Sequence, residues 1–353
     1  MGNRLQNYAL QFVLSKYSSN ITNLDNGYSE FDSRNYKHQV KELIKNILSF
    51  LGLKKYKDWS IYNKNRRARY LINKEFTDKY IHNITKVTYD NVYQKNWNNY
   101  DLAIVGSDQV WHKWRDNDKE LPYYYLEFLP ESKRASYAAS FGFDEFPKED
   151  REQHVEGLRG MKYISCRETS GCNLVKKVTG QRVPHVLDPT LLLNAQDWRK
   201  LSSDSNHYSK SQKKYAFIYF LGELTPEYES EIKRILNTKG LEAINFLDFM
   251  NSEISNCGPK EFISLIDNSD IVLTDSFHAT VFSILFDKPF EVFRRKGKGM
   301  EKMFSRIEEL LVNTGNQDKS FDSVTSNLKT ENLNSLRQTS INYIEKVLND
   351  EVQ

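Results

Sequence analysis

His278 lies at a position where a histidine side chain could transfer protons to or from a ligand. His278 follows the apolar run 271–274 and falls in the first turn of a helix predicted over 277–286. A strand that runs into a helix exposes the residues between them at the carboxyl end of a parallel sheet, where α/β proteins bind ligands. The helix dipole disfavours an imidazolium there, whereas a bound phosphate favours it. This balance suits proton transfer near neutral pH. The alternative is a buried histidine that only hydrogen-bonds to backbone.

Arg167 occupies the matching place in the first half of the chain. It follows the apolar run 161–166, and a helix is predicted from Glu168. A guanidinium beside a helix start can clamp a carboxylate or phosphate through two parallel hydrogen bonds. The alternative is a surface arginine paired with Glu168. Cys166 ends the apolar run, so we expect this thiol to be buried.

A basic loop follows the apolar run 290–293. Its four cations, Arg294, Arg295, Lys296 and Lys298, lie within five residues and are joined by Gly297. Such a loop can bind phosphate; a mobile charged hairpin is the alternative.

Two loops after predicted strands carry groups that suit sugar hydroxyls. Ser107, Asp108 and Gln109 offer a hydroxyl, a carboxylate and an amide directly after the run 101–105, and Trp111 can stack on a pyranose. Ser140 is small enough to let a ligand approach the backbone. Ordinary loop capping is the alternative for both loops.

The segment 2–6 opens the first predicted helix, over 3–17. A helix N-terminus can hold an anion. We assign Asn3 and Gln6 of this segment to the acceptor side of the site.

The elements that must position these residues alternate between strands and helices. This alternation is typical of parallel sheets in an α/β fold. Around 194–213 the chain turns polar, and we predict a linker there. With 353 residues, about two domains are expected. We predict two doubly wound domains over 1–195 and 196–325, and a C-terminal helix within 326–353. The predicted strands are 101–105, 135–141, 161–166, 183–187, 215–221, 242–246, 271–274 and 290–293.

Two polar helices are predicted over 37–56 and 64–82, and a final amphipathic helix over 332–348. The second polar helix carries Lys64, Arg66, Arg67 and Arg69. Its plain interpretation is a solvated face, and a peripheral contact with an anionic membrane surface is the alternative.

Composition excludes several classes of protein. The chain has 50 basic and 47 acidic residues, a formal net charge of +3, so a dedicated nucleic-acid binder is not expected. Three cysteines without a CxxC pair indicate a reducing compartment and no structural zinc. His, Asp and Glu show no metal-ligand spacing, so we expect no metal and no cofactor. No signal peptide follows Met1 and no window is long and apolar enough to span a membrane, so we expect a cytoplasmic protein.

Six motifs, taken together and in this order, resemble the polysaccharide pyruvyl transferase family. The resemblance extends from Gly2 to about Leu311. The motifs are GNRLQNYALQ (2–11), VGSDQVW (105–111), SYAASFG (136–142), SCRETSG (165–171), LDPTL (187–191) and TDSFHAT (274–280).

This resemblance implies a glycosyltransferase-B-like fold of two Rossmann-like domains, and transfer of the pyruvyl group of phosphoenolpyruvate onto a sugar as a ketal. The family's donor-binding arginine corresponds to Arg167 and its active-site histidine to His278. A downstream cation of the family corresponds to Lys298. The implied partners are phosphoenolpyruvate, as co-substrate, and a sugar or lipid-linked glycan. A lipid-linked acceptor would place the protein at the inner face of the membrane.

The chain departs from the family pattern in two places. Many members have arginine where this chain has Ser276, so we expect Arg294 or Lys296 to supply the missing charge beside Ser276 in the donor site. Relatives also carry a strand before the 2–11 motif, which we expect to be absent here or to lie outside this sequence.

Two other functions stay open at this point. One is a glycosyltransferase of the same fold that uses a nucleotide-sugar donor, because fold does not fix function. The other is a glycan-binding protein without catalysis, for which Ser276 leaves room.

Overall fold

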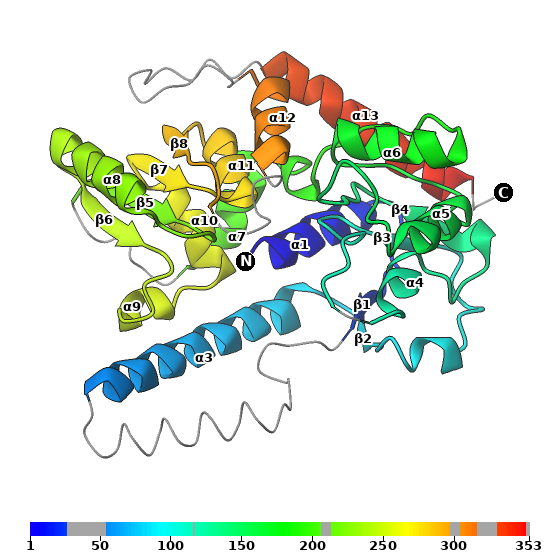
Figure 1. The fold of residues 1–353 in the computed structure, drawn as a ribbon, viewed down its shortest axis with the longest axis horizontal. Coiled ribbons are helices and arrows are strands. Elements are labelled where there is room, and N and C mark those ends of the chain that lie inside the picture. Colours follow the sequence, from blue (N-terminus) through cyan, green and yellow to red (C-terminus); the bar gives the residue numbers. More distant parts are fainter. Residues whose placement is uncertain (27–53, 116, 206–212, 297–303, 316–329, 351–353) are drawn as a thin grey trace. The chain divides into compact units, whose positions relative to one another are not determined.

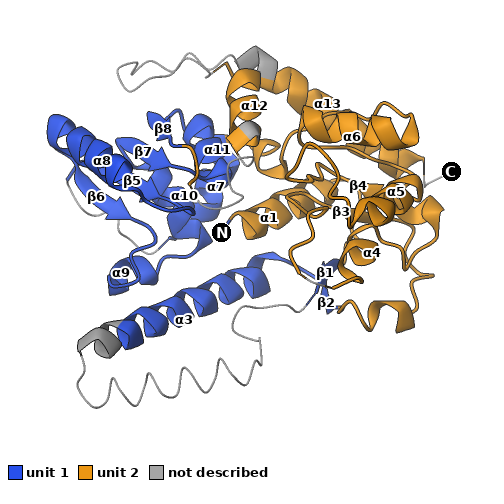
Figure 2. Ribbon diagram, viewed as in Figure 1, with its two compact units in different colours: residues 1, 23–86, 195–293 blue, residues 2–22, 87–194, 294–353 orange. Residues whose placement is uncertain are grey.

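The computed structural model describes residues 1–353 except 27–53, 116, 206–212, 297–303, 316–329 and 351–353 (Figure 1). The described chain forms two compact units (Figure 2). Unit 1 comprises Met1, 23–86 and 195–293, and unit 2 comprises 2–22, 87–194 and 294–353. Each unit is described by itself below.

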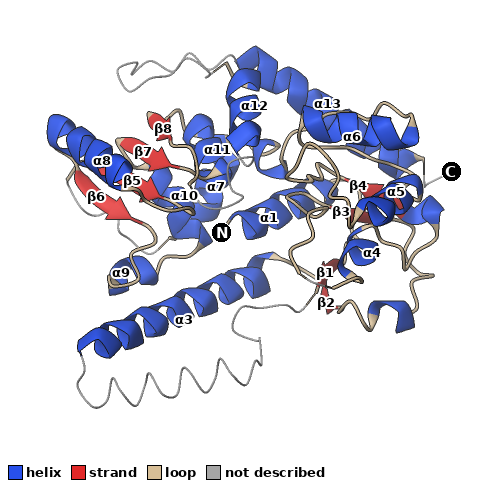
Figure 3. Cartoon of the chain, in the orientation of Figure 1, coloured by secondary structure: helices blue, strands red, loops and turns tan. Residues whose placement is uncertain are grey.

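Unit 1 is built on a four-stranded parallel sheet (Figure 3). Its strands are β5 (Tyr215–Tyr219), β6 (Glu242–Asn245), β7 (Ile271–Thr274) and β8 (Phe290–Val292), in the order β6-β5-β7-β8. Every residue of β5 and β7 is buried, whereas the edge strand β6 is mostly exposed. Central strands of a parallel sheet are covered on both faces, so they read as continuous apolar runs. The predicted α/β fold with parallel sheets is confirmed.

The helices of unit 1 begin and end at recognisable signals. In α8 (Pro226–Lys239), the Thr225 hydroxyl accepts a hydrogen bond from the Tyr228 N–H, and Gly240 ends the helix in the left-handed conformation with φ of 61°. In α10 (Pro259–Asp267), the Glu261 carboxylate accepts a hydrogen bond from the Gly258 N–H. The other helices between strands are α7 (Ala195–Ser202), α9 (Ser252–Ser255) and α11 (Phe277–Leu285).

The predicted linker over 194–213 is wrong for its first part. Residues Ala195–Ser202 form helix α7, and Trp198 and Leu201 are buried on one of its faces. The Trp198 ring meets the Phe282 ring edge-on at 5.0 Å. This stretch is mostly polar, but its apolar residues Trp198 and Leu201 are three positions apart. That spacing places both on one helix face, which packs against the rest of unit 1. Residues 206–212 of the predicted linker lie outside the described residues.

Helix α3 (Lys54–Tyr80) contains most of the predicted helix 64–82. Lys64 and Arg67 are exposed, as a solvated face requires. Arg69 instead is buried: it donates hydrogen bonds to the carbonyls of Phe246 and Ile254, and its guanidinium lies 4.3 Å from the Phe246 ring centroid. Arg69 therefore anchors α3 to the rest of unit 1 and is no part of a solvated or membrane-facing surface. Most of the predicted helix 37–56 lies outside the described residues. Unit 1 also holds the parallel strand pair β1 (Asn23–Asp25) and β2 (Ile84–Lys86).

Unit 2 contains a shorter and less regular parallel array. Strands β3 (Ala103–Val105) and β4 (Arg134–Ser136) pair in parallel, and single bridges join Ala139 to Cys166 and Cys166 to His185. The helices of this unit are α1 (Gly2–Leu14), α4 (Glu120–Tyr124), α5 (Arg151–Arg159), α6 (Thr169–Thr179), α12 (Ser305–Asn313) and α13 (Thr330–Asn349).

The predicted strands 161–166 and 183–187 are present only as such bridges. Side-chain hydroxyls take part in the ladder: Ser165 N donates to Ser136 Oγ at 3.1 Å, and Ala138 N donates to Ser165 Oγ at 3.1 Å. Serine hydroxyls compete in this way with backbone partners. Pro184, which has no N–H, interrupts the second segment. Across the array the segments 103–108, 134–139, 163–166 and 185 follow one another in chain order.

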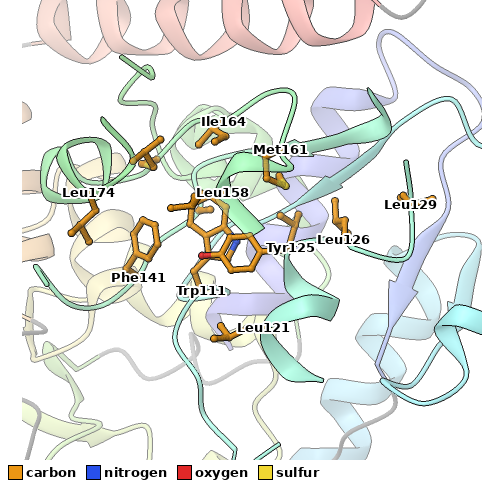
Figure 4. Packing of buried hydrophobic residues seen from close by; sticks show 14 residues of the cluster. Trp111, Leu121, Tyr125, Leu126, Leu129, Phe141, Leu158, Met161, Ile164 and Leu174 are labelled. Atoms are coloured by element: carbon orange, nitrogen blue, oxygen red, sulfur yellow. The ribbon is translucent and has the colours of Figure 1, made fainter. Parts of the chain in front are cut away.

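A core of large apolar side chains supports this array (Figure 4). Trp111 and Tyr125 stack with ring centroids 5.3 Å apart, and Phe141 lies 4.8 Å from Trp111. Helix α13 also packs against the array, because Tyr343 OH donates to Ser136 O at 2.7 Å and Leu187 N donates to Ser340 Oγ at 2.9 Å. The last helix thus packs back on the body, as expected.

The two compact units share one boundary with the predicted domains, near residue 195. They differ in two segments. Residues 23–86 group with 195–293, and the chain from Arg294 onward groups with 87–194. Hydrogen bonds from α3 and α13 to distant parts of the sequence account for this grouping. No local sequence pattern predicts these hydrogen bonds. None of the helices in the described part of the chain is long and apolar enough to cross a membrane.

Glu291 on β8 provides a pH-dependent test of unit 1. Its burial, with a smaller contribution from Glu231, raises the pKa of this carboxyl to about 7. The folded state therefore binds more protons than the unfolded state between about pH 4.5 and 7, and stability falls as the pH rises through this window. We expect Glu291→Gln to raise the free energy of unfolding by about 1–2 kcal/mol at pH 8 and by little at pH 4, after allowance for partial exposure.

Thermal unfolding of Glu291→Gln and wild type across this pH range measures the effect. The exposed Glu229, on α8, provides the control Glu229→Gln. An equal stabilisation by Glu291→Gln at pH 4 and pH 8 would contradict the assignment.

Candidate active site

The carboxyl ends of the parallel segments in unit 2 bring the candidate residues together. Bridges place Asp108 beside Ala139, Ala139 beside Cys166, and Cys166 beside His185. The loops that follow these positions carry Ser140, Arg167 and Asp188. Residues from four separate stretches of sequence therefore meet at one edge of the array, where open α/β sheets bind ligands.

Arg167 lies at the centre of this edge and is bound by three carboxylates. Its Nε lies 3.1 Å from Glu168 Oε1, its Nη1 3.0 Å from Asp188 Oδ2, and its Nη2 3.4 Å from Asp108 Oδ1. Only 3% of its side chain is exposed. Burial alone would lower the pKa of the guanidinium, but the three carboxylates outweigh burial and raise it above its usual range. Arg167 is thus a permanent buried cation, and the interpretation as a surface arginine is wrong.

Asp188 fixes the inner side of the cluster and was not selected from the sequence. Its Oδ2 accepts hydrogen bonds from Gln6 Nε2 at 2.6 Å and from Arg167 Nη1 at 3.0 Å. Its Oδ1 accepts hydrogen bonds from the N–H and the hydroxyl of Thr190, so Asp188 caps the short 3₁₀ turn Pro189–Leu191. Its place in the LDPTL motif, directly after a predicted strand, is the sequence signal that could have identified it.

Gln6 and Ser107 belong to the same network. Gln6 Nε2 lies 2.6 Å from Ser107 Oγ, and both side chains are buried. The start of α1 is thereby tied to the loop after β3. Asn3, one turn earlier in α1, is exposed.

Asp108 is the most accessible acid of the cluster. Its side chain is 29% exposed, whereas that of Asp188 is fully buried. Its backbone adopts the left-handed conformation with φ of 68°. Asp108 Oδ1 lies 3.4 Å from Arg167 Nη2 and 3.8 Å from Nη1 of Arg306, a residue of α12. Sequence reasoning missed Arg306, since a single arginine in an amphipathic helix carries no local signal.

Two glycines allow the loops to approach each other. A Cβ on Gly106 would lie 2.1 Å from the Tyr137 carbonyl oxygen, and one on Gly142 would lie 2.1 Å from Gln109 Nε2. Both glycines have positive φ, 122° and 74°. Only glycine meets both demands at these positions.

The remaining acceptor candidates of unit 2 are buried. Ser140 and Gln109 are covered, and within the described chain Ser140 Oγ and Gln109 Nε2 have no hydrogen-bond partner. Trp111 is fully buried in the core shown in Figure 4, and its Nε1 donates to the Tyr124 carbonyl. A ring packed between Tyr125 and Phe141 cannot stack on a sugar. The prediction that Trp111 contacts the acceptor is therefore wrong. Trp111 instead packs in the core beneath the loop that follows β3.

His278 lies in the first turn of α11 in unit 1, directly after β7, as predicted. The strand order places the switch point of this sheet between β5 and β7. Asp275 spans that point, because its carboxylate accepts hydrogen bonds from Leu221 N and Gly222 N, each at 2.7 Å. His278 is partly buried, and Ser276 is buried without a side-chain capping hydrogen bond. Asp275 thus stabilises the loop after β5 instead of capping α11.

The basic loop is described only in part. Arg294 Nη2 donates to Glu308 Oε1 at 2.6 Å, and its guanidinium lies 4.4 Å from the Phe304 ring centroid. Lys296 is exposed, and Lys298 lies outside the described residues.

The described residues contain no group of three or more His, Cys, Asp or Glu side chains arranged to hold a metal ion. The three cysteines are free, and burial raises the pKa of the Cys166 thiol well above its usual range. The expectation that Cys166 is buried is confirmed.

Comparison with known proteins now identifies the chain's family. A search of curated proteins gave no match. The family model for polysaccharide pyruvyl transferase, in contrast, matches residues 1–296. This match includes the loops that carry Asp108, Arg167, Asp188 and His278, and it covers most of the chain. The protein therefore belongs to the polysaccharide pyruvyl transferase family.

Proposed function

We propose that this protein transfers the pyruvyl group of phosphoenolpyruvate onto two hydroxyls of a sugar in a cell-surface polysaccharide precursor, as a ketal. Family membership supports a pyruvyl transferase of polysaccharides. The observation that carries the donor assignment is the buried Arg167, held at the carboxyl ends of the parallel segments. We further propose that the two units are the Rossmann-like halves of a glycosyltransferase-B-like enzyme, unit 1 contributing His278 and unit 2 contributing Arg167.

The donor fits a site built on buried cations. Phosphoenolpyruvate carries a carboxylate and a phosphate on one carbon framework, so its binding needs guanidinium or ammonium groups at short distance. Of the three carboxylates that bind Arg167, Asp108 makes the longest contact and has the most exposed side chain. An incoming carboxylate can replace Asp108 on Nη2 while Glu168 and Asp188 continue to hold the guanidinium in place. Arg294, Lys296 and Lys298 are proposed to add charge beside Ser276.

The proposed reaction balances without a redox step. The methylene carbon of phosphoenolpyruvate gains a proton and becomes a methyl group, which leaves the central carbon electrophilic. One sugar hydroxyl adds to that carbon, and a second displaces the phosphate, which leaves with the bridging oxygen and its electron pair. Of the two hydroxyl protons, one balances the proton taken up by the methylene and the other leaves with phosphate. We assign the proton transfers to His278 and the stabilisation of departing phosphate to the cations.

The acceptor is proposed to approach the loop after β3. Asp108 and Asn3 are the accessible polar groups among the acceptor candidates of unit 2. Gln6, Ser107, Gln109 and Ser140 are buried and are proposed to shape the loop that meets the sugar. A lipid-linked glycan would bring the enzyme to the cytoplasmic face of the membrane, where the exposed Lys64 and Arg67 of α3 can contact anionic lipid.

The test is release of inorganic phosphate from phosphoenolpyruvate in the presence of a panel of lipid-linked and free oligosaccharide acceptors. We expect release that depends on acceptor, with a mass gain of one pyruvyl ketal in the product. Nucleotide-sugar donors are assayed in parallel. Glycosyl transfer from one of these donors, without phosphate release from phosphoenolpyruvate, would overturn the proposal in favour of a glycosyltransferase.

A further inference from the structure

Helix α12 is fixed against the candidate site by contacts on several sides. Its residues Ile307 and Leu310 are buried. Glu309 accepts hydrogen bonds from the N–H and hydroxyl of Thr169, the first residue of α6, with 2.9 Å from the N–H to Oε1. Glu308 pairs with Arg294 at 2.6 Å. The position of Arg306, which directly precedes Ile307 on this helix, is therefore set by packing in unit 2.

Arg306 is a buried cation with little compensation. Its side chain is 10% exposed, and its Nε has no hydrogen-bond partner in the part of the chain that the structure describes. Its ion pair with Asp108 is long, 3.8 Å, and Asp108 is shared with Arg167. Burial, and then the nearby Arg167, lower the pKa of this guanidinium to about 10, so it still carries its charge at neutral pH. A buried charge in this state is unfavourable unless an anion joins it.

A pocket opens beside this guanidinium. It is lined by the loop 141–144, by Glu168, by Ser170 and Gly171 at the start of α6, and by Arg306 itself. Asp144 and Glu168 are the acidic groups on its wall, and Glu168 also forms an ion pair with Arg167. Arg306 thus reaches from the far end of the sequence into the site formed by residues 108–188.

We propose that Arg306 binds the anionic donor together with Arg167, and that the Asp108 carboxylate occupies the place of the donor's anion in the unliganded protein. This inference rests on the proposed function for the identity of the donor, phosphoenolpyruvate. Arg306 lies beyond the residues 1–296 that match the family model, so the family match does not assign it. Two guanidiniums that share one carboxylate form a seat for a carboxylate or phosphate, since each offers parallel N–H donors.

A bound donor anion would compensate the buried charge of Arg306 better than Asp108 does. Asp108, the most accessible acid of the cluster, lies between the two guanidiniums and gives each of them only a long contact. A substrate anion that takes its place can form shorter, charge-assisted hydrogen bonds to both. The site would then be complete only when α12 is docked, so donor binding depends on a helix outside the matched family region.

Calorimetric titration of the full-length protein tests this inference, with phosphoenolpyruvate and inorganic phosphate as probes. We expect Arg306→Gln to weaken phosphoenolpyruvate binding about 10–100-fold, equivalent to about 1.4–2.8 kcal/mol. Arg306→Lys should retain the charge and lose less, because it lacks only the guanidinium fork. Asp108→Asn should bind phosphoenolpyruvate several-fold more tightly, since the competing carboxylate is gone.

The exposed Val312 on α12 provides the matched control Val312→Ala, which should bind as wild type. Circular dichroism and thermal unfolding establish that each variant is folded. A folded Arg306→Gln variant with wild-type affinity overturns the inference, as does a wild-type protein that binds neither probe. If the wild type binds phosphate but not phosphoenolpyruvate, and Arg306→Gln no longer binds phosphate, the anion site is supported and the proposed donor is wrong.

Discussion

Replacing Arg167 by alanine is expected to reduce kcat/KM for phosphoenolpyruvate by about 30- to 4,000-fold. Truncating one partner of a buried, hydrogen-bonded charge pair typically costs about 2–5 kcal/mol, and each 1.4 kcal/mol is a factor of ten. The same change leaves Glu168 and Asp188 buried without their cation. Stability should therefore fall by about 3–5 kcal/mol, and the loss should appear as a lower unfolding temperature.

A second variant separates catalysis from folding. Arg167→Lys keeps a cation among Glu168, Asp188 and Asp108 but cannot form the bidentate fork. We expect a folded protein with a raised KM for phosphoenolpyruvate and a smaller loss of kcat. Arg199→Ala is the control, because Arg199 forms an ion pair with Asp267 in unit 1 and its side chain is half exposed. A folded Arg167→Lys variant with wild-type kinetics would contradict the donor role of Arg167.

Replacing His278 by glutamine is expected to lower kcat by about 10²–10⁴-fold, the usual contribution of a positioned acid or base. Asp275 and the buried β7 position this residue, and neither depends on the imidazole, so the variant should fold. Binding of phosphoenolpyruvate should change much less than kcat. The pH–rate profile should also lose the limb that reports the imidazole.

The exposed His82 supplies the control His82→Gln, which should leave both kcat and the profile unchanged. Retention of kcat within a few-fold in His278→Gln, with an unaltered pH profile, would remove His278 from the mechanism. The phosphate-release assay with the best acceptor from the panel measures both variants.

The elements that the sequence predicted well are those whose burial is complete. β5 and β7 are covered on both faces, so their apolar runs stood out from the polar loops that flank them. The ends of helices α8 and α10 carry residue types that favour helix termini, namely Thr225 and Gly240 for α8 and Glu261 for α10. The segments 161–166 and 183–187 are less completely apolar, and the hydroxyls of Ser136 and Ser165 and the proline at 184 reduce their pairing to single bridges.

The site was predictable where a residue lies next to its own strand. Arg167, Asp108 and His278 each follow an apolar run, so local order alone placed them at a sheet edge. Asp188 also follows a predicted strand, but its partners Gln6 and Arg167 are distant in sequence. No local pattern shows that Arg306 of α12 returns to the loops of unit 2. Trp111 shows the reverse error: an aromatic ring after a strand suits sugar stacking, but Tyr125 and Phe141 enclose it.

The central claim is that phosphoenolpyruvate is the donor and that Arg167 binds it. A crystal structure of the protein soaked with phosphoenolpyruvate tests this claim most directly. We expect density for the donor with an anionic oxygen within hydrogen-bond distance of Arg167, and with Asp108 displaced from the guanidinium Nη2. An Arg167 that keeps all three carboxylates, with no phosphoenolpyruvate at this edge under saturating soak, would contradict the account.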